Sequence, residues 1–231
     1  MTQLPVNNIN IYNESSLHAD LKSWYAHPGD LVEVPVGGYI IDIKRADLLI
    51  EIQYRNFYNI KKKLSKLLLD HHVHLVHPIA EVKWIKRLPV DENTTLGRRK
   101  SPKKGRPEQV FVELVHISEI IRHPNFSLEI IMIEQEEIRL NDGKGSWRRR
   151  GWSIIDHKLI KASDSISFES PQAYRKFIPT EMAQPFTNRE LSEFLSISQN
   201  LAQKMVYCLR KMNLIKVIGK KGRSNLNLLI E

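Results

Sequence analysis

Hydrophobic residues first recur at helical spacing and then alternate with polar residues over several short segments. In residues 13–26, leucines and aromatic residues lie three or four positions apart, which predicts an amphipathic helix. Segments 31–36, 39–44 and 47–53 are apolar, rich in β-branched residues and separated by turns, as is typical of strands. The chain is therefore expected to open with one helix and three strands.

The next stretch returns to helical spacing before further strands. Apolar residues mark one face of residues 56–71, and segments 72–78 and 81–88 are expected to be two strands. This α-β-β-β-α-β order is typical of an α/β domain. After Pro107 the pattern predicts one long helix, continued to residue 123.

A long strand followed by a hairpin partner is expected next. Residues 126–140 carry the strand pattern, and residues 152–162 carry a matching pattern across a short loop. We find no internal repeat in the chain.

The last fifty residues have a different pattern. Thr187 and Glu190 have the spacing of a capping box at the start of a short helix, and residues 198–213 predict a second helix. Two short strands around residues 219–222 follow. Residues 184–231 resemble the winged-helix family, which implies DNA binding through the second helix and the hairpin; the alternative is a winged helix used for protein contacts. The residues expected to contact DNA here are Gln199, Asn200, Gln203, Lys204, Lys220, Lys221 and Arg223.

Composition is that of a globular protein. The 231 residues are 42% hydrophobic and 26% charged, and no apolar run approaches the roughly 20 residues of a membrane helix. The N-terminal residues lack the pattern of a signal peptide. A single cysteine, Cys208, offers neither an internal disulfide nor a zinc cluster. We expect a cytoplasmic protein that is not bound to a membrane.

The charge of the chain is strongly basic and clustered. The formal net charge is +9, and residues 97–106 and 144–152 hold six and four basic residues with no acid. Clusters of one sign favour a polyanion, and tryptophans beside arginines suit stacking on bases, although solvated loops are the alternative. We therefore expect DNA as the partner. The contacts expected in these loops are Arg98, Arg99, Lys100, Lys103, Lys104, Arg106, Trp147, Arg148, Arg149 and Arg150.

Two acidic residues interrupt the predicted hairpin of residues 39–53. With a two-residue turn at Arg45 and Ala46, Asp42, Glu51 and Gln53 project from one face of the hairpin. Neighbouring carboxylates repel each other unless a cation or protons intervene, and Mg²⁺ prefers oxygen ligands. The opposite face is expected to pack on a helix layer through Ile41, Ile43, Leu48, Ile50 and Ile52.

Asp42 followed by Glu51-Ile52-Gln53 resembles the motif of the PD-(D/E)XK nuclease superfamily over roughly residues 10–90. Glu14 matches the acidic residue that some members carry on the preceding helix. Gln53 departs from the pattern, because a lysine is usual there. One of the lysines at 61–63 on the following helix could supply the missing lysine. The favoured interpretation of these three residues is nevertheless a solvated helix face.

This resemblance implies a Mg²⁺- or Mn²⁺-dependent DNA endonuclease with a restriction-endonuclease-like mixed sheet flanked by helices. Glu14, Asp42 and Glu51 would be metal ligands, with Gln53 beside them, and His18 would act as a general base or a phosphate contact. A homodimer is an expectation from the resemblance alone. The domains expected are a core at 1–90, its extension at 91–180, and a small winged-helix domain at 181–231.

Two other functions remain open at this stage. One is a DNA-binding protein with a degenerate nuclease core, which the Gln53 departure favours. The other is a metal-independent DNA-repair enzyme that acts on a base. No Gly-rich phosphate loop is present, so we do not expect a nucleotide cofactor.

Overall fold

The computed structural model describes residues 15–88 and 97–230. Its first elements follow the α-β-β-β-α-β order expected from the hydrophobic pattern. Ser15 caps the first helix by accepting a hydrogen bond from the backbone N–H of His18, so the helix begins at Ser16. The elements are α1 (Ser16–Tyr25), β1 (Leu31–Val36), β2 (Tyr39–Arg45), β3 (Leu48–Ile52), α2 (Phe57–Leu67) and β4 (His72–Leu88).

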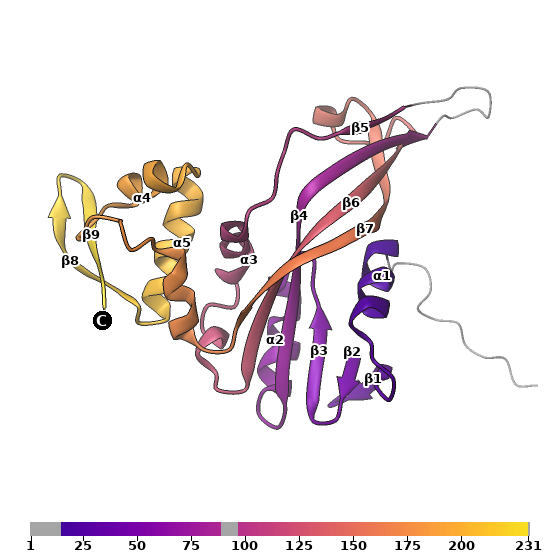
Figure 1. Cartoon of the computed structure of the whole chain (residues 1–231), viewed down its shortest axis with the longest axis horizontal. Helices are drawn as coiled ribbons and strands as arrows, with labels where there is room; N and C mark the ends of the chain where they lie inside the picture. Colours follow the sequence, from indigo (N-terminus) through magenta and orange to yellow (C-terminus); the bar gives the residue numbers. More distant parts are fainter. Residues whose placement is uncertain (1–14, 89–96, 231) are drawn as a thin grey trace, which may run out of the picture.

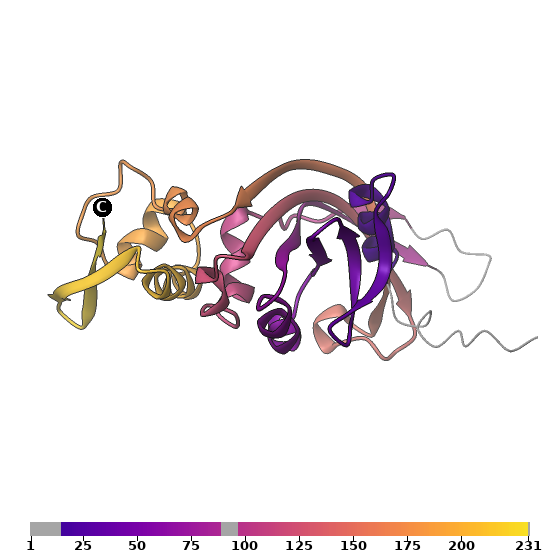
Figure 2. The same cartoon turned by 90° about the horizontal axis from the view of Figure 1, so that it is seen from below.

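Three long strands dominate the sheet (Figure 1). The two strands expected over 72–88 are one strand, β4, because a bulge between Ala80 and Val82 absorbs the irregularity without ending the pairing. The sheet order is β1-β2-β3-β4-β6-β7, with β5 paired to β4. Figure 2 shows that β6 and β7 arch over the shorter strands. The added strands are β5 (Arg98–Lys100), β6 (Phe126–Asn141) and β7 (Trp152–Phe168).

The sheet is mixed, as expected for this class of α/β fold. The pairs β3–β4 and β4–β6 are parallel, and the other pairs are antiparallel. Helix α2 connects β3 to its parallel neighbour β4, which requires a crossover rather than a tight turn. No helix in the part of the chain described by the structure is long and apolar enough to cross a membrane.

The prediction of a single long helix after Pro107 is wrong. The segment forms η1 (Pro107–Val110), which continues directly into α3 (Phe111–Leu114), and then, after turns, η2 (Ile120–Arg122). These short pieces have several neighbours: η1 lies against β4, β6 and α5, α3 lies against α2 and α5, and η2 lies against β6. One straight helix could not reach all of them, so tertiary packing overrides the local helical pattern.

Helices cover the sheet on two sides. Leu17 and Leu21 of α1 pack with Ile43, Ile50 and Ile52 in one buried cluster. Phe57 and Leu64 of α2 belong to a second cluster, and Ile41 lies in that cluster rather than beside Ile43 as expected. The pairing of β2 with β3 stops at Ile43, so the residues before it pair only with β1.

The hairpin turn lies one residue later than the sequence pattern suggested. Arg45 pairs with Leu48, so Ala46 and Asp47 form the turn, and the expected turn at Arg45 and Ala46 is wrong. Arg45 is held in the strand because its guanidinium binds the Asp30 carboxylate at 2.8 Å. The pairing shifts by two positions, and an even shift leaves the side chains of the paired residues, from Ile43 to Ile50, on their original faces.

The last part of the chain forms two helices and a hairpin beside the sheet (Figure 1). Thr187 and Glu190 form the expected capping box. Arg106 Nη1 donates to the backbone oxygen of Leu195 at 2.8 Å. One buried cluster includes Phe111 and Phe177 together with residues of both helices, so the unit packs firmly on the core. Its elements are η4 (Pro171–Phe177), α4 (Asn188–Leu195), α5 (Gln199–Lys211), β8 (Ile215–Lys221) and β9 (Ser224–Leu229).

The segment after β5 lies very close to β4 at Gly105. A Cβ atom added at Gly105 would lie 2.4 Å from the backbone oxygen of Ala80, whereas one added at Gly97 would meet nothing within 4 Å. We expect Gly105→Ala to lower the free energy of unfolding by about 1–3 kcal/mol, as overpacking does. Urea unfolding of both variants checks this, and equal stability of Gly105→Ala and Gly97→Ala would contradict it.

Candidate active site

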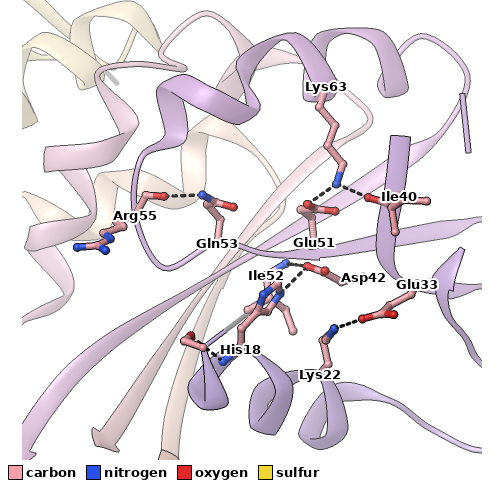
Figure 3. A network of polar contacts seen from close by, with 11 residues as sticks. His18, Lys22, Glu33, Ile40, Asp42, Glu51, Ile52, Gln53, Arg55 and Lys63 are labelled. Atoms are coloured by element: carbon pink, nitrogen blue, oxygen red, sulfur yellow. Dashed lines mark hydrogen bonds and ion pairs between the residues drawn. The ribbon is translucent and has the colours of Figure 1, made fainter. Parts of the chain in front are cut away.

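Asp42 lies where the backbone pairing of β2 with β3 has ended, and its carboxylate takes the place of a backbone acceptor for β3 (Figure 3). Asp42 Oδ2 accepts a hydrogen bond from the backbone N–H of Ile52 at 2.7 Å. The same oxygen lies 3.1 Å from Nε2 of His18, which α1 presents from the other side. A backbone donor and an imidazole therefore compensate this buried carboxylate.

Glu51 follows on β3 and is 6% exposed. Its Oε1 is ion-paired with Nζ of Lys63, which also donates to the backbone oxygen of Ile40 at 2.6 Å (Figure 3). Its Oε2 is buried and has no hydrogen-bond partner among the residues described. One oxygen of Glu51 is thus compensated and the other is left uncompensated.

The electrostatics of the site follow from this arrangement. Burial and then the negative charge of Asp42 raise the pKa of Glu51 to about 7, and Lys63 opposes both effects. Near neutral pH the Glu51 carboxylate therefore lies close to the balance between its protonated and charged forms. A bound cation would shift this balance toward the charged form.

Lys63 corrects the expectation that residues 61–63 form a solvated helix face. Only Lys62 is exposed, and Lys61 pairs with Glu119 at 3.4 Å. The Lys63 side chain is only 14% exposed. Lys63 lies beside Leu64 on the border of the buried face of α2, which was the available signal in the sequence.

Gln53 does not turn toward the carboxylates. Its side-chain Nε2 donates to the backbone oxygen of Arg55 at 2.5 Å (Figure 3). Its backbone oxygen contacts His77 Nδ1 at 2.8 Å. Glu14, the remaining expected metal ligand, lies outside the described residues. The structure thus brings Asp42, Glu51 and His18 together and leaves Gln53 at the margin.

A cavity of about 300 Å³ lies beside this group, lined by His18 and Gln53. Tyr54, Arg55 and His157 also line it, and the sequence pattern indicated none of these three residues. Burial lowers the pKa of His157, which favours the neutral form of its imidazole. His157 lies on β7, and the order of the strands in the sheet places it at this cavity. Nothing in its local sequence indicates this position.

The first basic loop is more ordered than its composition suggested. Arg98 belongs to β5, stacks 4.1 Å from the Trp84 ring centre and pairs with Glu136 at 2.7 Å. Arg106 is engaged within the protein, with Leu195 and with Glu108 at 2.9 Å. The other basic residues of this loop are exposed: Arg99, Lys100, Lys103 and Lys104.

The second basic loop carries an exposed aromatic ring. Trp147 is 82% exposed, and the Arg148 guanidinium lies 5.4 Å from its ring centre. Arg149 is half-buried and donates to the backbone oxygen of Trp152 at 3.1 Å, while Arg150 is exposed. An exposed tryptophan with adjacent arginines is able to stack on an unpaired base.

The residues expected to contact DNA near the C-terminus lie on α5 and on the hairpin. On α5, Gln199, Asn200 and Gln203 are exposed and Lys204 is half-buried. On the hairpin, Lys220, Lys221 and Arg223 are exposed. Lys221 pairs with Glu190 at 2.7 Å, which ties the hairpin to α4.

A ready-made metal site is not evident in the described part of the chain. Within residues 15–88 and 97–230 no group of three or more His, Cys, Asp or Glu side chains is arranged to hold a metal ion. The expectation of Mg²⁺ or Mn²⁺ therefore depends on Asp42, Glu51 and the uncompensated oxygen described above.

Comparison with known proteins gives two matches and no established activity. An uncharacterized protein of Treponema pallidum (strain Nichols) is 30% identical over 186 residues, which are 80% of this chain and 74% of that protein. No solved structure matches. A family model described as a domain of unknown function, DUF8091, matches residues 15–169, which include α1, the whole sheet and the candidate site. The chain belongs to this DUF8091 family.

Proposed function

We propose that this protein is a divalent-metal-dependent DNA endonuclease whose active site contains Asp42 and Glu51. The observation that carries the proposal is the buried Oε2 of Glu51, which has no hydrogen-bond partner among the residues described. A buried carboxylate oxygen without a hydrogen-bond partner lowers the stability of the fold. A hard divalent cation bound to this oxygen would remove that penalty. Its position beside Asp42 supports a shared role for the two carboxylates.

The residues present fit a divalent cation. Glu51 Oε2 and the Asp42 carboxylate would hold it, and Glu14 is a further candidate ligand from the sequence pattern. When bound, such a cation supplies an activated water and neutralises the charge that develops on a phosphodiester. The raised pKa of Glu51 supports this fit, because a cation next to the carboxylate offsets both the burial and the repulsion from Asp42.

Lys63 takes the role for which Gln53 is unsuited. Its ammonium group contacts Glu51 and is held in place by the backbone oxygen of Ile40. A fixed positive charge at this point stabilises negative charge on a phosphate next to Glu51. His18 orients Asp42 from the opposite side, which makes it a positioning residue.

DNA as the substrate is supported by the distribution of charge. The net charge is +9, and most of the residues expected to contact DNA are exposed in the structure. The α4–α5 pair with its basic hairpin supports a winged helix that binds duplex DNA. Arg106 is left out of the proposed contacts, since its guanidinium binds Leu195 and Glu108. A homodimer would allow both strands to be cut.

A second candidate is a DNA-binding protein that does not cleave DNA. The orientation of Gln53 toward Arg55 favours it, because this side chain makes no contact with either carboxylate among the described residues. The two candidates share the substrate and differ only in whether Glu51 supports hydrolysis.

Cleavage assays separate the two candidates. Wild type and Glu51→Gln are incubated with linear, nicked, flapped and branched DNA in Mg²⁺, in Mn²⁺ and in chelator. We expect metal-dependent strand cleavage by the wild type and at least about a 100-fold lower rate for the variant, since a metal ligand is lost. Equal binding by both proteins without any cleavage would rule out the endonuclease.

Lys63 and Lys62 form a matched pair on α2. We expect Lys63→Met to lower the cleavage rate by about 100- to 1000-fold, as removal of a preorganised charge-stabilising group does, and Lys62→Met to leave it unchanged. Because Lys63 lowers the pKa of Glu51, the first variant also raises that pKa further above about 7. The two pH–rate profiles measure both effects, and identical profiles would argue against this role.

Stability provides a readout that needs no cleavage. The folded-state pKa of Glu51 is raised from 4.5 to about 7, so its stabilising contribution is complete below pH 4.5 and is lost as the pH rises through 7. In chelator, the unfolding free energy of the wild type should fall between pH 4.5 and 8 by on the order of 3 kcal/mol more than that of Glu51→Gln.

Mg²⁺ should raise the melting temperature of the wild type at pH 8 and not that of Glu51→Gln. The exposed Glu81→Gln provides a carboxylate control that should behave as the wild type. A Mg²⁺-induced shift of equal size in all three proteins would show that the cation binds away from Glu51.

A further inference from the structure

A second cleft, of about 450 Å³, lies between β4, residues 103–105 and the start of α5. It shares two lining residues, Tyr54 and Pro78, with the cavity beside the candidate active site. The two hollows are therefore neighbours that meet at Tyr54 and Pro78.

The segment that forms one wall of this cleft is fixed at both ends to β4. The backbone N–H of Ser101 donates to the oxygen of Lys83 at 2.7 Å, and that of Gly105 donates to the oxygen of Ala80 at 2.8 Å. The backbones approach so closely at Gly105 that no Cβ fits there. Between these anchors the chain presents two consecutive lysines, Lys103 and Lys104, which we call the lysine arch.

The charges that face the cleft are mostly uncompensated. Lys103 and Lys104 line it and are exposed, and their side chains make no ion pair or hydrogen bond with any residue described. Lys83 is paired with Glu137 at 3.2 Å. Glu113 is the acidic residue in the lining, and its Oε2 already accepts the backbone N–H of Phe57 at 3.0 Å.

Two like charges held next to each other repel, and the repulsion is relieved by an anion that spans both. A phosphodiester backbone carries such charges at regular spacing along its length. The polar side chains of Ser198 and Asn200 line the facing wall, where they can donate hydrogen bonds to phosphate oxygens.

We propose that the lysine arch and the start of α5 bind the phosphate backbone of the DNA strand that passes through the candidate active site. This inference rests on the proposed function, because the cleft and the carboxylates would hold one continuous strand. It assigns to Lys103 and Lys104 a positioning role that is independent of base sequence, since lysine contacts phosphate as a point charge.

The experiment measures binding without cleavage. Fluorescence anisotropy with duplex and single-stranded DNA, at several salt concentrations and in chelator, uses full-length Glu51→Gln as the parent protein. We expect Lys103→Ala/Lys104→Ala in this background to weaken binding and to reduce the slope of log K against log salt by about 1.4–1.8, the effect of two lost phosphate contacts. Lys158→Ala/Lys161→Ala removes the same charge from exposed β7 positions outside this cleft and should leave the slope unchanged.

The outcomes separate this proposal from the nuclease proposal. A reduced slope together with no cleavage by the wild type would support the cleft and overturn the endonuclease. An unchanged slope in the arch variant, or an equal reduction in the β7 control, would overturn the cleft whether or not the wild type cleaves DNA. Binding of RNA or nucleotides with no binding of DNA would overturn both. Thermal unfolding of each variant verifies that the fold is intact.

Discussion

The ion pair between Lys63 of α2 and Glu51 of β3 joins the helix layer to the sheet at the point where β2 and β3 separate. It allows a carboxylate to remain inside the protein, because removal of the lysine would leave a buried charge with no opposite charge next to it. Because the strands separate, the Asp42 carboxylate is able to accept a hydrogen bond from the backbone N–H of Ile52. The candidate site is thus a local interruption of the sheet that is held together by side chains from two helices.

Local pattern was sufficient to predict the elements that enclose this site. The apolar spacing of α1 and α2 and the alternation in β2 and β3 correctly indicated a helix layer and a hairpin with acidic residues on it. The exact turn was missed because Arg45 is drawn into β2 by Asp30, a residue that lies before β1. Lys63 was misjudged because its place beside Leu64 only hints at burial, and its contact with the backbone oxygen of Ile40 depends on how α2 lies against β2.

Residues that depend on sheet order or on tertiary packing were beyond reach of the sequence. His157 joins the cavity only because β7 follows β6 at the edge of the sheet. The helix expected after Pro107 is divided because its apolar residues pack against β4, β6, α2 and α5. In both places long-range contacts, rather than propensity, determine the structure.

The family match ends at residue 169, whereas the buried cluster of the core continues into α4 and α5. Phe111 and Leu114 are fully buried, and α5 packs against the short helix that carries them. The C-terminal unit is therefore not an appendage on a flexible tether. A relative that ends at the family boundary would need polar residues at the positions of Phe111 and Leu114, or another chain that covers them. The residues at these two positions therefore distinguish truncated members of the family from members that retain the C-terminal unit.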